Sequence, residues 1–102
     1  MKSLTEKTFS ESTKDTTCIV DFWAPWCGPC VGMKATLEGI EDSDAMVYKI
    51  NVDENEELTS RFGIKSVPTL IFMTNGEEVE RLVGAKTKEQ ILEVYKKVKG
   101  VA

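Results

Sequence analysis

The chain has 102 residues, of which 41% are hydrophobic and 29% are charged, close to the average of soluble folded domains. This composition excludes a disordered tail, a collagen-like chain, a coiled coil and a membrane protein, and the length indicates one domain over residues 1–102. The net charge of −4 argues against nucleic acid or an anionic membrane as a partner. Because the sequence contains no histidine, it excludes serine–histidine and cysteine–histidine catalysis and imidazole metal ligands.

The first half of the chain predicts two strands separated by one long helix. Residues 1–16 contain few large apolar side chains, and we expect only a short strand and a short polar helix there. Residues 17–23 are rich in β-branched and aromatic side chains and predict a buried strand. Apolar residues at the spacing i, i+4 and i+7 from Met33 predict a helix over residues 28–41. A second strand is predicted over residues 45–52.

The second half predicts a short helix and then a hairpin. Residues 56–62 carry apolar side chains four positions apart, and Gly63 follows where a helix would end. Residues 69–73 form an apolar run that predicts a strand. The dipeptide Asn75–Gly76 is the strongest short-range hairpin signal, so the returning strand is expected over residues 78–83.

A capping box predicts the last helix. Thr87 stands three residues before Gln90, the spacing at which the two side chains cap each other's backbone, and the helix is expected to run to about Lys99. The complete order is strand, helix, strand, helix, hairpin, helix. It predicts an α/β fold, with a central mixed sheet of four to five strands and helices on both faces.

Cys27 and Cys30 stand where the first buried strand passes into the helix. Cysteines three residues apart at a helix start can form a disulfide. The free N–H groups of a helix start stabilise a thiolate, so we expect the pKa of the Cys27 thiol to lie below the free value of about 8.5. Cys30, one turn further in, is expected to be more buried. These differences make Cys27 the attacking sulfur and Cys30 the resolving one.

The cysteine pair has an alternative interpretation as part of a metal site, and its neighbours have roles of their own. A Cys-x-x-C pair is also half of a zinc site, but such a site needs four ligands and the only further thiol is Cys18. Cys18 is expected to be a buried packing residue. Gly28 would let a partner chain approach closely, and Pro29 fits the first helical turn, where its missing N–H is not needed.

Three cysteines and no visible secretory signal indicate a reducing compartment, the cytoplasm.

Several segments together carry a family resemblance. Trp23–Cys30 reads Trp-Ala-Pro-Trp-Cys-Gly-Pro-Cys and follows Val20–Phe22. Three further segments keep an unbroken spacing among themselves: Val67–Thr69, Asn75–Gly76 and Val83–Ala85. From about residue 17 to the last residue of the chain, the sequence resembles the thioredoxin family.

The resemblance implies a thioredoxin fold and an enzyme that reduces disulfides in other proteins without a bound cofactor. It implies that electrons come from NADPH through a flavoprotein, thioredoxin reductase. The partners would then be this reductase and disulfide-containing proteins. We expect the protein to act as a monomer.

The resemblance also implies roles for two charged residues. Asp21 lies within the predicted strand of residues 17–23, so burial is expected to raise its pKa toward neutrality. The family uses an aspartate at this position to take the proton from the buried cysteine, here Cys30, through water. Lys49 matches a lysine that the family places near this aspartate. The alternatives are a carboxylate satisfied by backbone groups and a solvated lysine.

The substrate side of the site is implied in the same way. Pro68 matches a cis-proline that faces the cysteines, and the Val67 backbone would pair with an extended substrate. Trp26 would be an exposed apolar platform, and Gly84 would leave room for a partner backbone. Without the resemblance, Pro68 would be an ordinary trans proline at a strand start, and Gly84 would belong to a plain turn.

Two departures from the family leave questions open. Val31 replaces the usual lysine or arginine after the second cysteine, which places an apolar group on the rim. Ala35 replaces a customary proline, so a kink in the helix is in doubt.

A disulfide-forming relative is disfavoured because such proteins usually carry a histidine between the cysteines. The rival from another class is a binding module within a larger complex, with Trp26 and Val31 as contact residues.

Overall fold

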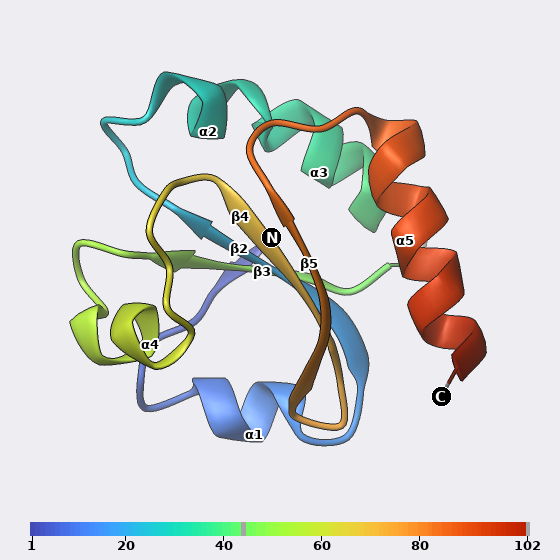
Figure 1. The fold of residues 1–102 in the computed structure, drawn as a ribbon, viewed down its shortest axis with the longest axis horizontal. Coiled ribbons are helices and arrows are strands. Elements are labelled where there is room, and N and C mark those ends of the chain that lie inside the picture. Colours follow the sequence, from blue (N-terminus) through green and yellow to red (C-terminus); the bar gives the residue numbers. More distant parts are fainter. Residues whose placement is uncertain (44, 102) are drawn as a thin grey trace.

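A five-stranded mixed sheet runs through the centre of the protein (Figure 1). The computed structural model describes residues 1–43 and 45–101. The strand order is β1-β3-β2-β4-β5. Strands β1, β3 and β2 are parallel, and β4 is antiparallel to both β2 and β5. The predicted α/β fold with a mixed sheet is confirmed.

The helices and strands lie close to their predicted positions, including the short strand and short helix expected before residue 17. Across the described residues, none of the helices is long and apolar enough to cross a membrane. In chain order the elements are β1 (Lys2–Ser3), α1 (Phe9–Thr13), β2 (Thr17–Trp23), α2 (Gly28–Gly32), α3 (Lys34–Glu41), β3 (Val47–Asn51), α4 (Glu56–Arg61), β4 (Thr69–Thr74), β5 (Glu77–Val83) and α5 (Lys88–Val101).

Helices cover both faces of the sheet, with α1 and α4 on one side and α3 and α5 on the other (Figure 1). Strand β2 is therefore buried on both faces, and its alternate side chains enter two separate cores. Val20 and Phe22 enter the core beside α1 and α4, together with Phe9 and Leu58. The opposite core contains Ile19, Met33, Leu37, Ile40, Val47, Leu70, Phe72, Ile91, Tyr95 and Val98.

The helix predicted over residues 28–41 is wrong as a single element, because it breaks at Met33 into α2 and α3. Met33 has φ −82° and ψ −8°, and its N–H is shared between the carbonyls of Pro29 at 3.1 Å and Cys30 at 3.2 Å. Gly32 precedes the break and weakens the helix there. The helix therefore breaks here even though position 35 is Ala35 and not the proline that is customary in the family.

The turn and capping signals of the second half are confirmed. Asn75 has φ 51° and Gly76 has φ 82°, the two positive values of a type I′ hairpin turn. Gly63, with φ 61°, follows α4. At the start of α5, the Thr87 N–H donates to Gln90 Oε1 at 2.9 Å and the Gln90 N–H donates to Thr87 Oγ1 at 3.2 Å.

Two glycines should respond in opposite ways to substitution by alanine. Gly76→Ala places a Cβ on a residue with positive φ, so we expect it to lower the free energy of unfolding by about 1–2 kcal/mol. Gly39 lies inside α3, and outside that helix the one atom of the described residues within 4 Å of an added Cβ is the Lys88 Nζ, at 3.8 Å. Gly39→Ala should therefore raise the free energy of unfolding by about 0.5–1 kcal/mol. Urea denaturation measures both, and a Gly76→Ala protein as stable as the parent would contradict the hairpin.

Candidate active site

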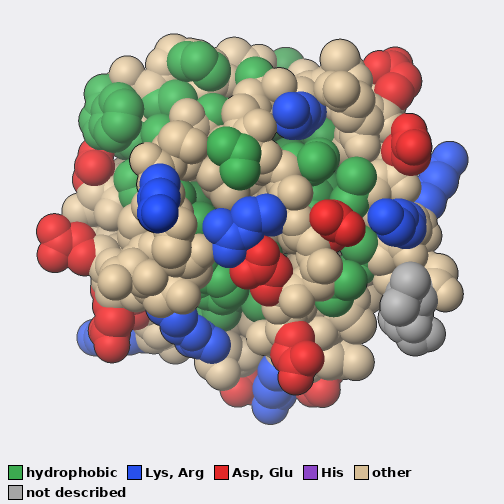
Figure 2. Space-filling view, in the orientation of Figure 1, with side chains coloured by type: hydrophobic (Ala, Val, Ile, Leu, Met, Phe, Trp, Pro, Cys, Tyr) green, Lys and Arg blue, Asp and Glu red, His purple; other side chains and the backbone are tan. Residues whose placement is uncertain are grey.

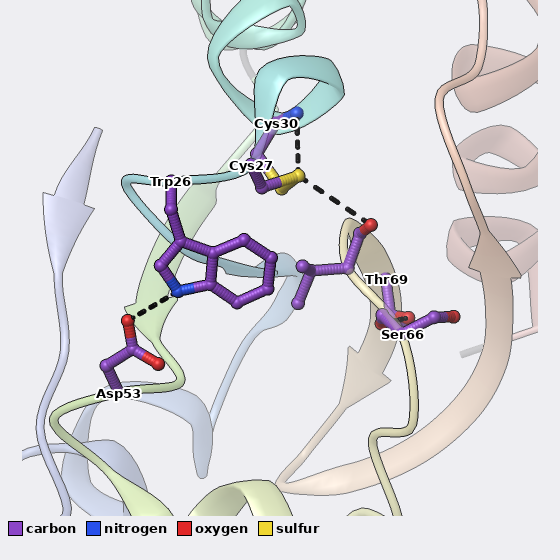
Figure 3. The surroundings of a disulfide bond; sticks show 7 residues. Trp26, Cys27, Cys30, Asp53, Ser66 and Thr69 are labelled. Carbon is purple, nitrogen blue, oxygen red and sulfur yellow. Dashed lines mark hydrogen bonds between the residues drawn. A yellow bond between two sulfur atoms is a disulfide. The ribbon is translucent and has the colours of Figure 1, made fainter.

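Cys27 and Cys30 form a disulfide at the start of α2, with their Cα atoms 5.2 Å apart (Figure 3). The predicted difference in burial is wrong for this oxidised form, because Cys27 is 5% exposed and Cys30 is 4% exposed. The reason is a loop from a distant part of the chain that covers Cys27. The carbonyl oxygen of Val67 lies 3.7 Å from the Cys27 Sγ.

The start of α2 directs a hydrogen-bond donor at one of the two sulfurs. Cys27 is the N-cap residue of α2, and the Cys30 N–H donates to its Sγ at 3.2 Å. Pro29 occupies the first turn, where the helix needs no N–H from it. A donor held against the Cys27 Sγ favours the thiolate over the thiol once the disulfide is reduced.

Asp21 lies on β2, on the sheet face that also carries Ile19, and is only 4% exposed. Its Oδ1 has no hydrogen-bond partner among the described residues. Burial raises the pKa of Asp21 from 3.8 to about 7, and the positive charge of Lys49 opposes this rise. The predicted shift toward neutrality is confirmed, and the alternative of a carboxylate fully satisfied by backbone groups is wrong for Oδ1.

A cavity of about 220 Å³ joins Asp21 to Cys30 and Lys49. All three are predicted site residues, and the fold brings them together. Two further residues of the cavity wall, Met1 and Lys34, were missed. Lys34 stands four positions after Cys30, and this helical spacing could have indicated that the two residues share a face. No residue near Met1 in the sequence indicates that it lines the cavity.

Lys49 is half-buried beside Asp21 and Trp23. It is paired with Asp21 in the register of the parallel strands β2 and β3. Its Nζ lies 5.0 Å from the centroid of the Trp23 ring, within the range of a cation–π contact. Trp23 packs against the cluster formed by Ala24 and the two cysteines, as expected for a residue beneath the site.

The loop that covers Cys27 contains the predicted cis-proline. The Val67–Pro68 peptide bond is cis, which agrees with the resemblance, and the Pro68 carbonyl accepts a hydrogen bond from the Gly84 N–H at 2.8 Å. Gly84 has φ +90°, and no atom of the described residues, apart from Gly84 and its two chain neighbours, lies within 4 Å of the place where a Cβ would stand. Open space therefore lies at Gly84, whose N–H is bonded to the Pro68 carbonyl.

The surface next to the disulfide is partly apolar. Trp26 is 69% exposed and Val31 is 57% exposed, and Gly28 and Pro29 are exposed as well. The Trp26 indole extends toward Asp53, where its Nε1–H donates to Asp53 Oδ2 at 2.8 Å (Figure 3). Asp53 was missed, because its position in the acidic run after β3 indicates only solvated charges.

The third cysteine stands apart from the site. Cys18 is fully buried and unpaired, and it packs in the core on the α1 and α4 side of the sheet. Burial raises the pKa of the Cys18 thiol to about 12, so it stays protonated and packs as a small apolar group. Residues 1–43 and 45–101 contain no group of three or more cysteine and carboxylate side chains that could hold a metal ion.

Comparisons with known proteins agree with this geometry. The thioredoxin family model matches residues 1–97. A thioredoxin of Bacillus subtilis (strain 168) is 41% identical over 96 residues, covering 91% of this chain and 92% of the relative. A thioredoxin of Alicyclobacillus acidocaldarius is 46% identical over 93 residues, covering 87% of this chain and 89% of that relative.

A solved structure leads to the same family. It is a mutant thioredoxin from Halobacterium salinarum NRC-1, which matches with a TM-score of 0.84 at 33% identity. The match covers 94% of this chain and 89% of that one. With the family model, the relatives and the fold in agreement, the chain belongs to the thioredoxin family.

Proposed function

We propose that this thiol–disulfide oxidoreductase reduces disulfides of other proteins with Cys27 as the nucleophile and Cys30 as the resolving thiol. The observation that carries the proposal is the Cys27–Cys30 disulfide at the start of α2, with the Cys30 N–H donating to the Cys27 Sγ. This donor favours a thiolate on Cys27 and makes it the stronger nucleophile of the two at neutral pH.

In the first step, the Cys27 thiolate attacks one sulfur of the substrate disulfide. A bond forms between the Cys27 Sγ and that sulfur, the substrate S–S bond breaks, and the other substrate sulfur leaves as a thiolate, which takes a proton from solvent. The product is a mixed disulfide between Cys27 and the substrate.

In the second step, Cys30 resolves the mixed disulfide. The Cys30 thiol gives its proton to the carboxylate of Asp21, and the resulting thiolate attacks the Cys27 Sγ. The bond between Cys27 and the substrate breaks as the Cys27–Cys30 disulfide forms, and the second substrate sulfur leaves as a thiolate that takes a proton from solvent. Asp21 then releases its proton to solvent, and two electrons have passed to the substrate. A pKa of Asp21 near 7 suits a base at neutral pH. The positive charge of Lys49 stabilises the carboxylate form of Asp21.

The substrate is held by the surface around Cys27. The backbone of Val67, beside Pro68, pairs with an extended segment of the substrate. Trp26 supplies an exposed apolar contact. Gly28, Pro29 and Gly84 let the substrate backbone approach the sulfurs, and the open space at Gly84 supports this assignment.

The electrons that return the pair to the dithiol come from NADPH through a thioredoxin reductase. We infer that residues 1–102 act as one domain, as a monomer in the cytoplasm and without a bound cofactor. The protein would take part in electron transport and in cellular redox homeostasis. No observation favours the alternative of a binding module within a larger complex.

Substitution of each cysteine in turn separates the two steps. With dithiothreitol as reductant and a protein disulfide as reporter, Cys27→Ser should lose catalysis because no sulfur can attack. Cys30→Ser should form the mixed disulfide and then stop, which mass spectrometry detects as a covalent adduct on Cys27. Cys18→Ala is the control and should keep the parent's turnover. Parent-like turnover by Cys27→Ser would contradict the mechanism.

The pKa of Asp21 makes stability depend on pH. Since the pKa is higher in the folded protein, at about 7, than the ordinary 3.8, the unfolded chain ionises first and folding stability falls as pH rises between these values. Asp21→Asn removes this loss. The free energy of unfolding of oxidised Asp21→Asn, relative to the oxidised parent, should rise by about 4 kcal/mol from pH 4 to pH 8. Urea denaturation measures it.

Asp15→Asn, at an exposed position, is the matched control for the substitution itself, because surface substitutions usually change stability by less than about 0.5 kcal/mol. If Asp21→Asn also follows the parent, the carboxyl has an ordinary pKa in the folded state.

The same substitution should slow the second step alone. Without a carboxylate at position 21, we expect resolution of the mixed disulfide at pH 7 to fall by about 100-fold, in line with the usual contribution of a general base. Rapid acid quenching and mass spectrometry of single-turnover mixtures would show the adduct on Cys27 accumulating. Unchanged resolution with a slower first attack would place Asp21 in the other step.

A further inference from the structure

Both ends of the active-site loop, residues 62–68, are bonded to strand β5. The loop begins at Phe62, directly after α4, and ends at Pro68, directly before β4. At its far end, the Pro68 carbonyl accepts a hydrogen bond from the Gly84 N–H at 2.8 Å. At its near end, the Phe62 carbonyl accepts one from the Arg81 Nη2 at 2.8 Å. The segment of β5 therefore holds the loop both where it leaves α4 and where it enters β4.

The Arg81 guanidinium is itself held by a second partner. Its Nε and Nη2 donate to the two carboxylate oxygens of Glu78 at 2.6 and 2.8 Å, the two-pronged geometry that gives an arginine–carboxylate pair its direction. These two side chains are 33% and 30% exposed. Another ion pair of β5, between Glu80 and Lys97, is longer at 3.8 Å, and its side chains are 42% and 73% exposed. The first pair is therefore the better ordered, and it directs an N–H at the Phe62 carbonyl.

A side chain on this strand would not be expected to matter for its charge alone. Strand β5 crosses the front of the molecule in Figure 1, and Figure 2, in the same orientation, shows acidic and basic side chains intermixed on that face. Exposed ion pairs of this kind contribute little. Arg81 differs because it also bonds a backbone carbonyl, and hydrogen bonds from a charged donor are stronger than those between neutral groups.

Phe62 connects this bond to the core and to the site. Its ring centroid lies 5.5 Å from that of Phe9 and 5.6 Å from that of Phe22, so its side chain is anchored while its carbonyl faces Arg81. Four residues separate Phe62 from Val67 in the sequence. A displacement of the Phe62 carbonyl would therefore reach the Val67 backbone through a short segment.

We propose that Arg81 is a positioning residue: by fixing the start of the active-site loop, it keeps the Val67 backbone in place to pair with an extended substrate at Cys27. The inference rests on the proposed reduction of protein disulfides. Among the described residues, the side-chain hydrogen bonds of Arg81 go to Glu78 and Phe62. Arg81 therefore acts on substrate binding through the loop and not on the sulfurs.

Two disulfides of different size test this role. One is an extended peptide whose cysteine is coupled to a small thiol, so it can pair with the Val67 backbone. The other is hydroxyethyl disulfide, which has no peptide backbone. Arg81→Met keeps an unbranched stem and removes the donors to the Phe62 carbonyl. We expect it to lower kcat/KM for the peptide by about three- to tenfold, the usual size for a residue that acts through its neighbours, and to change kcat/KM for the small disulfide by less than about twofold.

The loss for the peptide should appear mainly as a higher KM, because the missing contact holds the substrate and takes no part in the chemistry. Both assays use dithiothreitol as reductant, with the uncatalysed rate subtracted. Unfolded protein would lose activity toward both disulfides alike. The ratio of the two kcat/KM values therefore reports the position of the loop and not the amount of folded protein.

Three further variants serve as controls. Lys97→Met also removes one positive charge and one ion pair of β5, and it should keep the parent's ratio. Arg81→Lys keeps a charged donor without the two-pronged geometry and should regain part of the peptide activity. Glu78→Gln should lower the ratio in the same direction as Arg81→Met. The double variant should be no worse than Arg81→Met alone, because the two residues act as one unit.

The outcomes separate this inference from the proposed function. If Arg81→Met keeps the parent's ratio, Arg81 does not position the loop for substrates and the inference is overturned. It is also overturned if Lys97→Met lowers the ratio as much as Arg81→Met does, since the effect would then be one of charge alone. If the parent reduces neither disulfide, the proposed function fails and the inference fails with it.

Discussion

The rest of the site depends on one unfavourable interaction, the burial of the Asp21 carboxyl beneath the cysteine pair without a full set of partners. A carboxyl with an unpaired oxygen at 4% exposure costs folding free energy whenever it is ionised. That cost is what raises its pKa to about 7. The fold therefore gives up stability at one position and gains a carboxyl that can exchange protons at neutral pH, as the proposed proton transfer requires.

The architecture maintains this arrangement from several directions. Strand β2 is central and covered on both faces, which leaves Asp21 only 4% exposed, and Asp21 lines a cavity that it shares with Cys30. Lys49, paired with it in register on β3, limits the rise in pKa and does not neutralise the carboxyl. The break at Met33 makes α2 a short helix of its own, which presents Cys27 and Cys30 at its first turn.

Features that depend on local chemistry could be predicted from the residues themselves, whereas contacts between distant residues were predicted only where the family resemblance implied them. The hairpin at Asn75 follows from backbone preferences of two residues, and the burial of Asp21 follows from its apolar neighbours on one strand. The break at Met33 escaped prediction because the apolar spacing is the same in one helix as in two. The cover over Cys27 escaped it because Val67 is 40 positions away, and only the folded chain brings them together.

The most direct test of the account is the titration of the Asp21 carboxyl itself. Carbon-13 NMR of the side-chain carboxyl in the oxidised protein, followed from pH 3 to pH 10, reports its ionisation without any effect of turnover. Asp21→Asn identifies the signal by its loss. The account predicts a midpoint at about 7. A midpoint near the ordinary value of 3.8 would show that the carboxyl is solvated or fully paired, and it would remove Asp21 from the proposed proton transfer.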